Sequence, residues 1–136
     1  LLPVPISAWR LATRHYNQAT LLCESISSEL NIPVNQSWAK RRGFSVQHHL
    51  SKMARAENAS RVFSLSTQCI DDEIAIAQGI KDGSNFSVAI VDDVLTTGVT
   101  VNILSKRLKK RYPNLHIQVW VAAFTPPPKS SLYQKA

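Results

Sequence analysis

The chain has 136 residues, of which 44% are hydrophobic and 18% charged; this usage fits one globular domain and excludes a disordered or fibrous protein. No apolar run approaches the ~20 residues of a membrane span, and two cysteines without a CxxC pair exclude a disulfide framework; we expect a cytoplasmic protein with Cys23 and Cys69 reduced. A net charge of +7 favours an anionic partner, either nucleic acid or a phosphorylated small molecule.

The N-terminal half predicts five elements in chain order. Residues 1–6 are apolar and interrupted by prolines, as in an edge strand. Apolar residues at three- and four-residue steps predict an amphipathic helix over 17–31. A short strand is expected at 32–34, a polar basic loop at 38–46, and a second helix, with a weaker pattern, at 47–59.

The C-terminal half alternates between strands and helices. A strand is expected at 62–65, and a short helix with acidic residues in its first turn at 71–79. The β-branched run at 87–91 is typical of a strand covered on both faces. A helix over 101–111 then ends in three cations, and a long strand follows at 117–124.

This alternation predicts an α/β fold with a mainly parallel sheet flanked by helices. We expect one domain over residues 1–124 and a loose Pro- and Ser-rich tail over 125–136.

The segment from Val88 to Thr100 carries the chemistry. Its apolar strand delivers two carboxylates, Asp92 and Asp93, at the end where open α/β sheets bind ligands. Next comes a small hydroxyl-rich loop whose backbone N–H groups can surround a phosphate at a helix N-terminus; its residues are Thr96, Thr97, Gly98, Val99 and Thr100. Carboxylates beside a phosphate cradle suit ribose hydroxyls or hydroxyls shared with Mg²⁺, so the segment describes a ribose 5-phosphate pocket.

Other interpretations of this segment are weaker. The two aspartates could cap a turn, but adjacent carboxylates at a buried strand end repel each other without a partner. A receiver domain needs a further Asp downstream, and no Asp follows Asp93. The Gly-Lys-Ser/Thr ending of a Walker loop and the GxGxxG motif are both absent from the sequence.

The motif VAIVDDVLTTGVT resembles the phosphoribosyl-pyrophosphate (PRPP) signature of type I phosphoribosyltransferases. The opening LLPVPISAWRLATRHYNQATLLC is similar to that of ComF/GntX-type proteins of the same family, and the resemblance covers roughly residues 1–124. It implies a type I phosphoribosyltransferase-like fold and Mg²⁺ bound through PRPP, with no metal held by the protein itself. It also implies that the catalytic Asp92 and Asp93 meet the ribose hydroxyls, while residues 96–100 hold the 5-phosphate.

Two departures from the family pattern stand out. His15 replaces the glycine of the family's RGFNQ motif, which places the backbone geometry near Arg14 in question. The N-terminal zinc ribbon typical of these proteins is also missing, so we expect the sequence to be a fragment of a longer protein or to have lost that segment.

The basic residues have two expected roles. Arg14 and Arg55 occupy family-pattern positions and are our candidates for the pyrophosphate of PRPP, although a solvated basic face also explains them. Lys109, Lys110 and Arg111 lie over roughly 15 Å from the phosphate end of the same helix, so they cannot serve that pocket. They form either a nucleic-acid-facing patch or cations that compensate the helix dipole.

The sequence therefore predicts a PRPP-binding, phosphoribosyltransferase-like protein linked to DNA uptake and natural transformation. Such an enzyme would displace pyrophosphate from PRPP with an acceptor that the sequence does not identify. The alternative is a non-catalytic accessory protein that senses PRPP or binds single-stranded DNA or the DNA-uptake machinery. The oligomeric state stays open.

Overall fold

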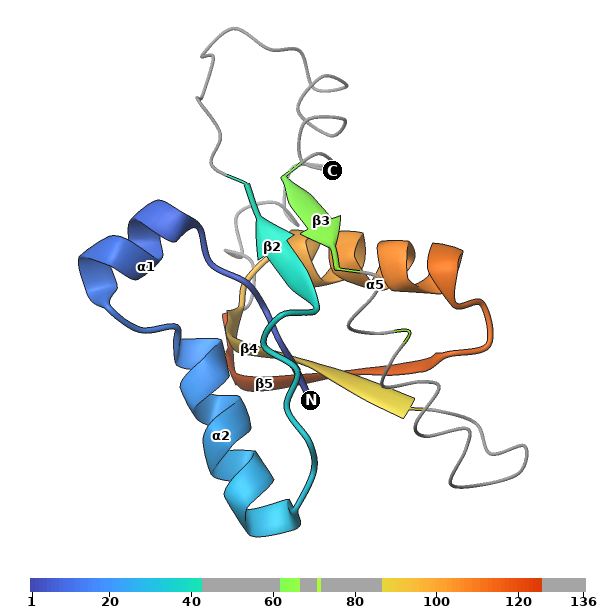
Figure 1. Ribbon diagram of the computed structural model, residues 1–136, viewed down its shortest axis with the longest axis horizontal. Coiled ribbons are helices and arrows are strands. Elements are labelled where there is room, and N and C mark those ends of the chain that lie inside the picture. The colour runs from blue at the N-terminus through green and yellow to red at the C-terminus, as the bar shows by residue number, and fades with distance from the viewer. Residues whose placement is uncertain (43–61, 67–70, 72–86, 126–136) are drawn as a thin grey trace, which may run out of the picture.

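The computed structural model of the protein describes residues 1–42, 62–66, 71 and 87–125. Three parallel strands form the main sheet in the order β1-β4-β5, with bounds Leu2–Pro3, Ser87–Leu95 and His116–Phe124. Two short strands, β2 (Ala39–Arg41) and β3 (Phe63–Leu65), form a separate antiparallel pair. The described helices are α1 (Ala8–Arg14), α2 (Gln18–Leu30) and α5 (Val99–Arg111) (Figure 1).

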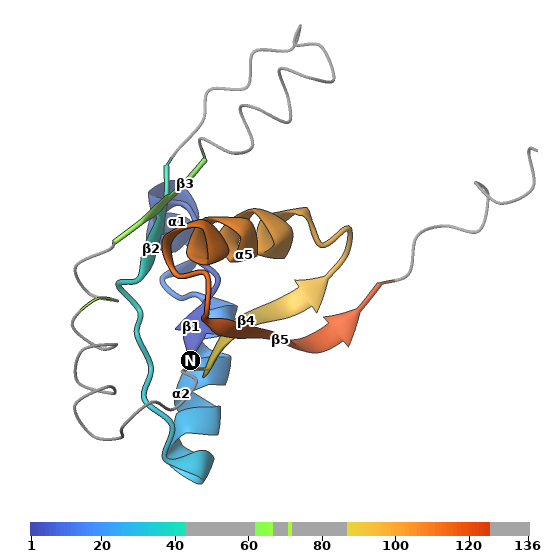
Figure 2. The same ribbon diagram turned by 90° about the vertical axis from the view of Figure 1, so that its right-hand side faces the viewer.

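Helices cover both faces of the main sheet. Figure 2 shows α5 on one side of β4 and β5 and α2 on the other. Because successive strand residues point to opposite faces, Ile90 packs with Leu104 and Leu108 of α5, whereas Ala89 and Val91 pack with α2. All five side chains are buried, or nearly so, and together they fix how β4 lies between the two helices.

The two long helices begin and end where the sequence supplies caps. The Asn17 side-chain oxygen accepts a hydrogen bond from the Ala19 backbone N–H (3.2 Å) at the start of α2, and Asn31 ends that helix in the left-handed conformation. Gly98, at φ +69°, is the N-cap of α5. Lys109, Lys110 and Arg111 lie in the last turn of that helix, where the helix dipole favours cations.

Several sequence predictions are confirmed. Residues 2–3 form an edge strand of the described sheet, and the helix predicted over 17–31 is α2. The predicted strands at 62–65 and 117–124 correspond to β3 and β5. The α/β class with a parallel sheet flanked by helices is likewise confirmed for the described residues.

The predicted strand at 32–34 is wrong. Pro33 lacks the N–H that a strand ladder needs. The Leu1 amino group donates to the Pro33 carbonyl, and the Leu1 carbonyl accepts from the N–H of Asn35, just beyond the segment. Ile32 and Val34 pack against the core without a strand ladder.

The predicted polar loop at 38–46 is wrong over residues 38–41. Trp38 is fully buried and donates its ring N–H to the Pro3 carbonyl (2.8 Å), and Ala39 to Arg41 form β2. The predicted helix at 47–59, the tail at 126–136 and nearly all of the predicted helix at 71–79 lie outside the described residues. The domain division at residue 124 remains a prediction.

Candidate phosphate-binding site at the β4–α5 junction

The two aspartates lie inside β4. The predicted strand ended at Val91, but β4 continues to Leu95, because its C-terminal half pairs with β5 up to Phe124. Alternation along this longer strand turns Asp92 to the α5 face, which it shares with Ile90, and Asp93 to the α2 face.

Asp92 and the hydroxyl-rich loop meet in one small hollow. This β4–α5 hollow has a volume of about 90 Å³ and is lined by Asp92, Val94, Leu95, Thr96, Thr97, Gly98, Val99, Thr100 and Val101. The structure thus brings one of the two predicted carboxylates together with all five predicted loop residues.

The backbone at Gly98 shapes the loop end of the hollow. Gly98 adopts φ +69°, a left-handed conformation that glycine reaches without the cost of a side chain, and its carbonyl accepts from the Asn102 N–H (2.9 Å). Because glycine has no side chain to cap α5, the N–H groups of the first helical turn remain available to an anion. The nearby threonine hydroxyls add further donors.

Asp92 is half-buried, and burial raises the pKa of its carboxyl group to about 6. The backbone N–H of Asp93 donates to Asp92 Oδ1 (3.0 Å) and lowers the pKa, whereas the side chain of Asp93 raises it. Burial therefore disfavours the charged form of Asp92, and a hydrogen-bond donor or a cation would reduce this energetic cost.

Asp93 lies apart from the loop. It lines a second hollow of about 430 Å³, between α2 and the end of β5, with Leu21, Leu22 and Ala122 among its neighbours. One Asp93 carboxylate oxygen accepts from the Val94 N–H (2.8 Å). The structure does not bring Asp93 into the β4–α5 hollow.

Of the two arginines predicted to bind pyrophosphate, the structure describes Arg14. Arg14 is exposed in the last turn of α1 and does not line the β4–α5 hollow. Arg55 lies outside the described residues. Directly after Arg14, His15 adopts φ +63°, a left-handed conformation at the position where the family pattern has glycine.

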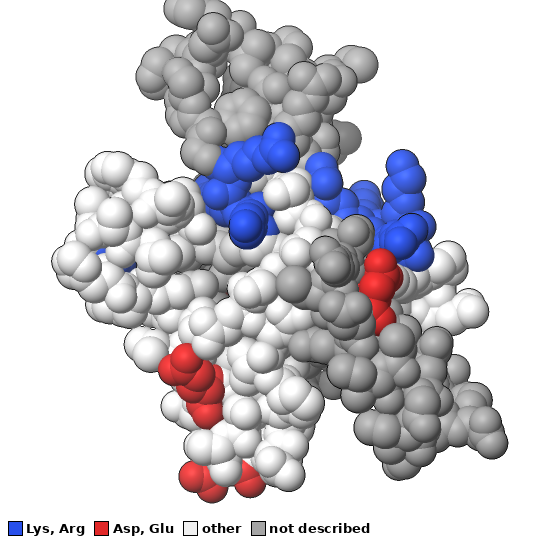
Figure 3. Space-filling view, viewed as in Figure 1, with Lys and Arg blue, Asp and Glu red and all other residues white. Residues whose placement is uncertain are grey.

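The predicted basic patch divides into two parts. Lys110 and Arg111 line a hollow of about 440 Å³ with Arg107, Ser64 and Leu65, which we call the α5–β3 groove. Lys109 is absent from that lining and donates to the Pro113 carbonyl (3.2 Å). Figure 3 shows Lys and Arg side chains gathered over β2 and the end of α5.

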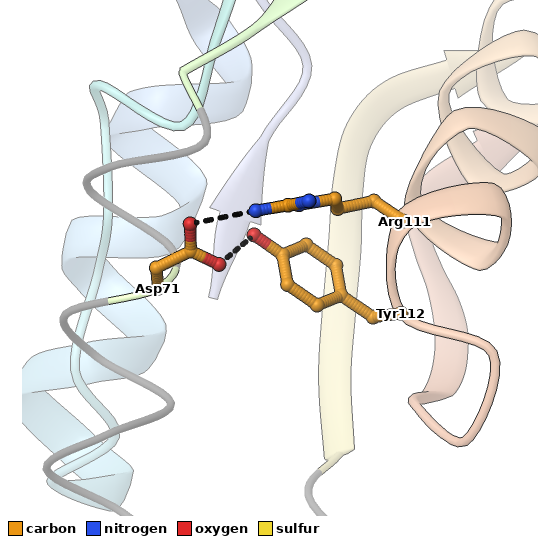
Figure 4. Close-up of polar contacts among 3 residues, drawn as sticks. All are labelled: Asp71, Arg111 and Tyr112. Carbon is orange, nitrogen blue, oxygen red and sulfur yellow. Dashed lines mark hydrogen bonds and ion pairs between the residues drawn. The ribbon is translucent and has the colours of Figure 1, made fainter.

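Arg111 is also tied to an acidic residue far away in the sequence. Its guanidinium pairs with Asp71 (3.2 Å), and the Tyr112 hydroxyl donates to the same carboxylate (2.7 Å) (Figure 4). The Tyr112 hydrogen bond and the Arg111 charge lower the pKa of Asp71. No local pattern in the sequence predicts this contact, because 40 residues separate the two charges.

Neither a metal centre nor a membrane span is seen in the described part of the chain. Among residues 1–42, 62–66, 71 and 87–125, no three His, Cys, Asp or Glu side chains group as metal ligands. None of the helices described has the length and apolar character needed to cross a membrane.

The fold and this junction define an α/β protein with a polar loop between a central strand and a helix. The chain is 37% identical to competence protein F of Haemophilus influenzae over 121 residues, which are 88% of this chain and 48% of that protein. It is 32% identical to the DNA utilization protein YhgH of Salmonella typhimurium and to that of Escherichia coli K12, in each case over 88% of this chain and 47% of the relative.

The chain thus spans about half the length of the curated relatives it matches. These similarities support the ComF-like relationship inferred from the sequence motifs. No family model matches the chain. No solved structure matches it.

Proposed function

We propose that the chain binds PRPP together with Mg²⁺ at the β4–α5 hollow, as a cytoplasmic, phosphoribosyltransferase-like protein of the ComF/GntX type. The observation that carries the proposal is the meeting of a half-buried carboxylate, Asp92, with the Thr96–Thr100 loop at the start of α5. A volume of about 90 Å³ suits a phosphate group rather than a whole sugar phosphate, so the remainder of PRPP would extend outward from the hollow.

Each part of the hollow has a distinct task in this proposal. The loop N–H groups and threonine hydroxyls donate to the 5-phosphate, and the start of α5 favours its negative charge. The Asp92 carboxylate accepts from a ribose hydroxyl, which provides the donor that its burial calls for. Asp93 remains a predicted second ribose contact, although its side chain lies on the other face of β4.

The oxygen donors at this junction fit Mg²⁺, which prefers oxygen ligands and usually shares them with substrate phosphates. The ion would be bound through the oxygens of PRPP, with Asp92 beside it at the ribose hydroxyls. Bound Mg²⁺ would neutralise charge on the departing pyrophosphate.

Calorimetric titration of PRPP with Mg²⁺ tests the site. Asp92→Asn and Thr97→Val should weaken binding by about tenfold or more, because the first removes the carboxylate charge and the second removes a hydroxyl that donates to the phosphate. Ser25→Ala, which lies in the hollow of Asp93, is the matched control and should leave the affinity unchanged. Equal heats for wild type and Asp92→Asn would remove the pocket from consideration.

Release of pyrophosphate separates an enzyme from a sensor. In a phosphoribosyl transfer, the bond between the ribose anomeric carbon and pyrophosphate breaks and a bond to the acceptor nucleophile forms. A panel of nucleobases and amines that yields pyrophosphate would identify the acceptor class. Tight PRPP binding without pyrophosphate release from any member would favour the sensor.

The second candidate function is binding of single-stranded DNA, favoured by the basic α5–β3 groove and the cations over β2. The names of the relatives, which mention competence and DNA utilization, agree with this candidate. Arg107→Ala with Lys110→Ala should weaken binding of an oligonucleotide and reduce its salt slope by about 0.7 for each lost phosphate contact. Lys109→Ala is the matched control because Lys109 does not line the groove; equal losses in both proteins would argue against the groove.

A further inference from the structure

One of the cations that line the α5–β3 groove is bound to a carboxylate of the protein itself. Arg107, Lys110 and Arg111 all line this groove. They share one face of α5, because residues three and four positions apart are neighbours on a helix surface. Arg111 also pairs with Asp71 (3.2 Å), which lies 40 positions earlier in the chain. An internal anion therefore lies beside the third cation of the groove.

Two donors converge on this carboxylate. Figure 4 shows the Arg111 guanidinium and the Tyr112 hydroxyl pointing toward Asp71 from the end of α5. The Tyr112 hydroxyl donates to one carboxylate oxygen (2.7 Å), and Arg111 donates to the other (3.2 Å). The guanidinium also lies 5.9 Å from the centre of the Tyr112 ring, an attractive contact that keeps the two donors together. We call this pair of residues the Arg111–Tyr112 clamp.

The clamp has the chemistry of a phosphate site. A guanidinium binds carboxylate and phosphate oxygens with the same fork of N–H donors, and a phenol hydroxyl donates to either group. The hydrogen bonds from Tyr112 and Arg111 lower the pKa of Asp71, so its side chain is an anion at neutral pH. The Asp71 carboxylate thus makes the contacts that a phosphate group would make at the same donors.

The contact is open to solvent. The side chain of Arg111 is 55% exposed and that of Asp71 is 43% exposed. Ion pairs with this exposure contribute little to stability and are screened by salt. Neither residue is buried in the core, so a variant without the Asp71 charge should keep its fold.

We propose that the Arg111–Tyr112 clamp is a phosphate subsite for single-stranded DNA, and that Asp71 occupies it in place of a phosphate and so limits how tightly the groove binds. The strand is then held by Arg107 and Lys110, while Arg111 stays with Asp71. The inference rests on the second candidate function, binding of single-stranded DNA at the α5–β3 groove. It adds to that function a residue of the protein that opposes binding.

Binding of a fluorescently labelled oligothymidylate to the full 136-residue chain tests the inference. Asp71→Asn removes the charge and keeps an oxygen that accepts from Tyr112. It should bind about fivefold more tightly at about 0.1 M salt, with a salt slope steeper by about 0.7, as expected for one added phosphate contact. Glu29→Gln is the matched control: it removes the same charge from an exposed position on α2 and should bind like wild type, because salt screens distant charges. If Asp71→Asn loses its folded circular dichroism spectrum, Asp71→Ser takes its place with the same expected direction.

An Arg111→Ala background separates the clamp from a general repulsion between Asp71 and DNA. Asp71→Asn should give no gain in affinity there, because the two side chains act as one unit. A gain that persists without Arg111, or equal affinities of Asp71→Asn and Glu29→Gln, would overturn the inference. The groove is judged separately by Arg107→Ala with Lys110→Ala. If this variant binds as well as wild type, the candidate function fails together with the inference; if it binds more weakly but Asp71→Asn brings no gain, only the inference fails.

Discussion

Replacing Asp92 by Asn should stabilise the ligand-free protein at neutral pH. Burial raises the pKa of Asp92 from 3.8 to about 6, so the fold favours the protonated acid over the carboxylate. At about 1.4 kcal/mol per pH unit, a rise of this size corresponds to about 3 kcal/mol. Asp92 is only half-buried, and solvent screening reduces the expected gain to roughly 1–1.5 kcal/mol.

The pH dependence gives this prediction its sign. A folded-state pKa above the unfolded value means that the native protein binds the proton more tightly. The stability due to Asp92 is therefore fully present below about pH 4, falls as the pH rises, and is lost above the folded pKa of about 6. The stability difference between wild type and Asp92→Asn should grow across this window and then level off.

Urea unfolding between about pH 4 and pH 8 measures the difference. Asp93→Asn is the comparison: it removes a neighbour that contributes less than burial to the Asp92 pKa, so its gain should be smaller. An Asp92→Asn protein that is less stable than wild type at pH 7, or a difference that does not change with pH, would refute the reasoning.

The same substitution should act in the opposite direction on ligand binding. A hydroxyl donor or a cation favours the charged carboxylate, so PRPP with Mg²⁺ should stabilise wild type more than Asp92→Asn in a thermal melt. A variant that is more stable than wild type without ligand, but is stabilised less than wild type by the ligand, is typical of the loss of a functional carboxylate. A merely structural Asp92 would leave the ligand-induced shift equal in the two proteins.

Three further predictions concern other residues. Gly98→Ala should cost about 1 kcal/mol in urea unfolding because of its φ of +69°, even though an added Cβ meets only a Leu95 methyl carbon at 3.8 Å; an unchanged midpoint would contradict this. His15→Gly should raise stability by about 0.5–1 kcal/mol, measured the same way, since glycine adopts φ +63° at lower cost; a loss would show that His15 contributes contacts worth more than the strain. Tyr112→Phe should raise the pKa of Asp71 in an NMR titration, because the Tyr112 hydrogen bond contributes most to lowering it; an unchanged pKa would exclude that cause.

Local sequence patterns were sufficient for the elements that pack on the main sheet. The periodicities of α2 and of Val101, Leu104 and Leu108 in α5 matched their buried faces, because burial on one side of a helix leaves a repeating apolar signal. By contrast, α1 buries no side chain and left no such signal, although Ser7 caps it through the Arg10 N–H (3.3 Å). Likewise, β2 is too short for a periodic pattern and depends on pairing with β3, more than 20 residues later in the chain.

The separation of the two aspartates shows why a motif alone did not define the site. Adjacent acidic residues at a strand end are expected to reach one ligand together if the strand stops before them. Here β4 remains paired with β5 through Leu95, and the Thr125 N–H donates to the Leu95 carbonyl (2.9 Å), so alternation continues through both residues. The extent of pairing with a strand more than 20 residues downstream therefore decides that Asp92, rather than Asp93, shares a hollow with the loop.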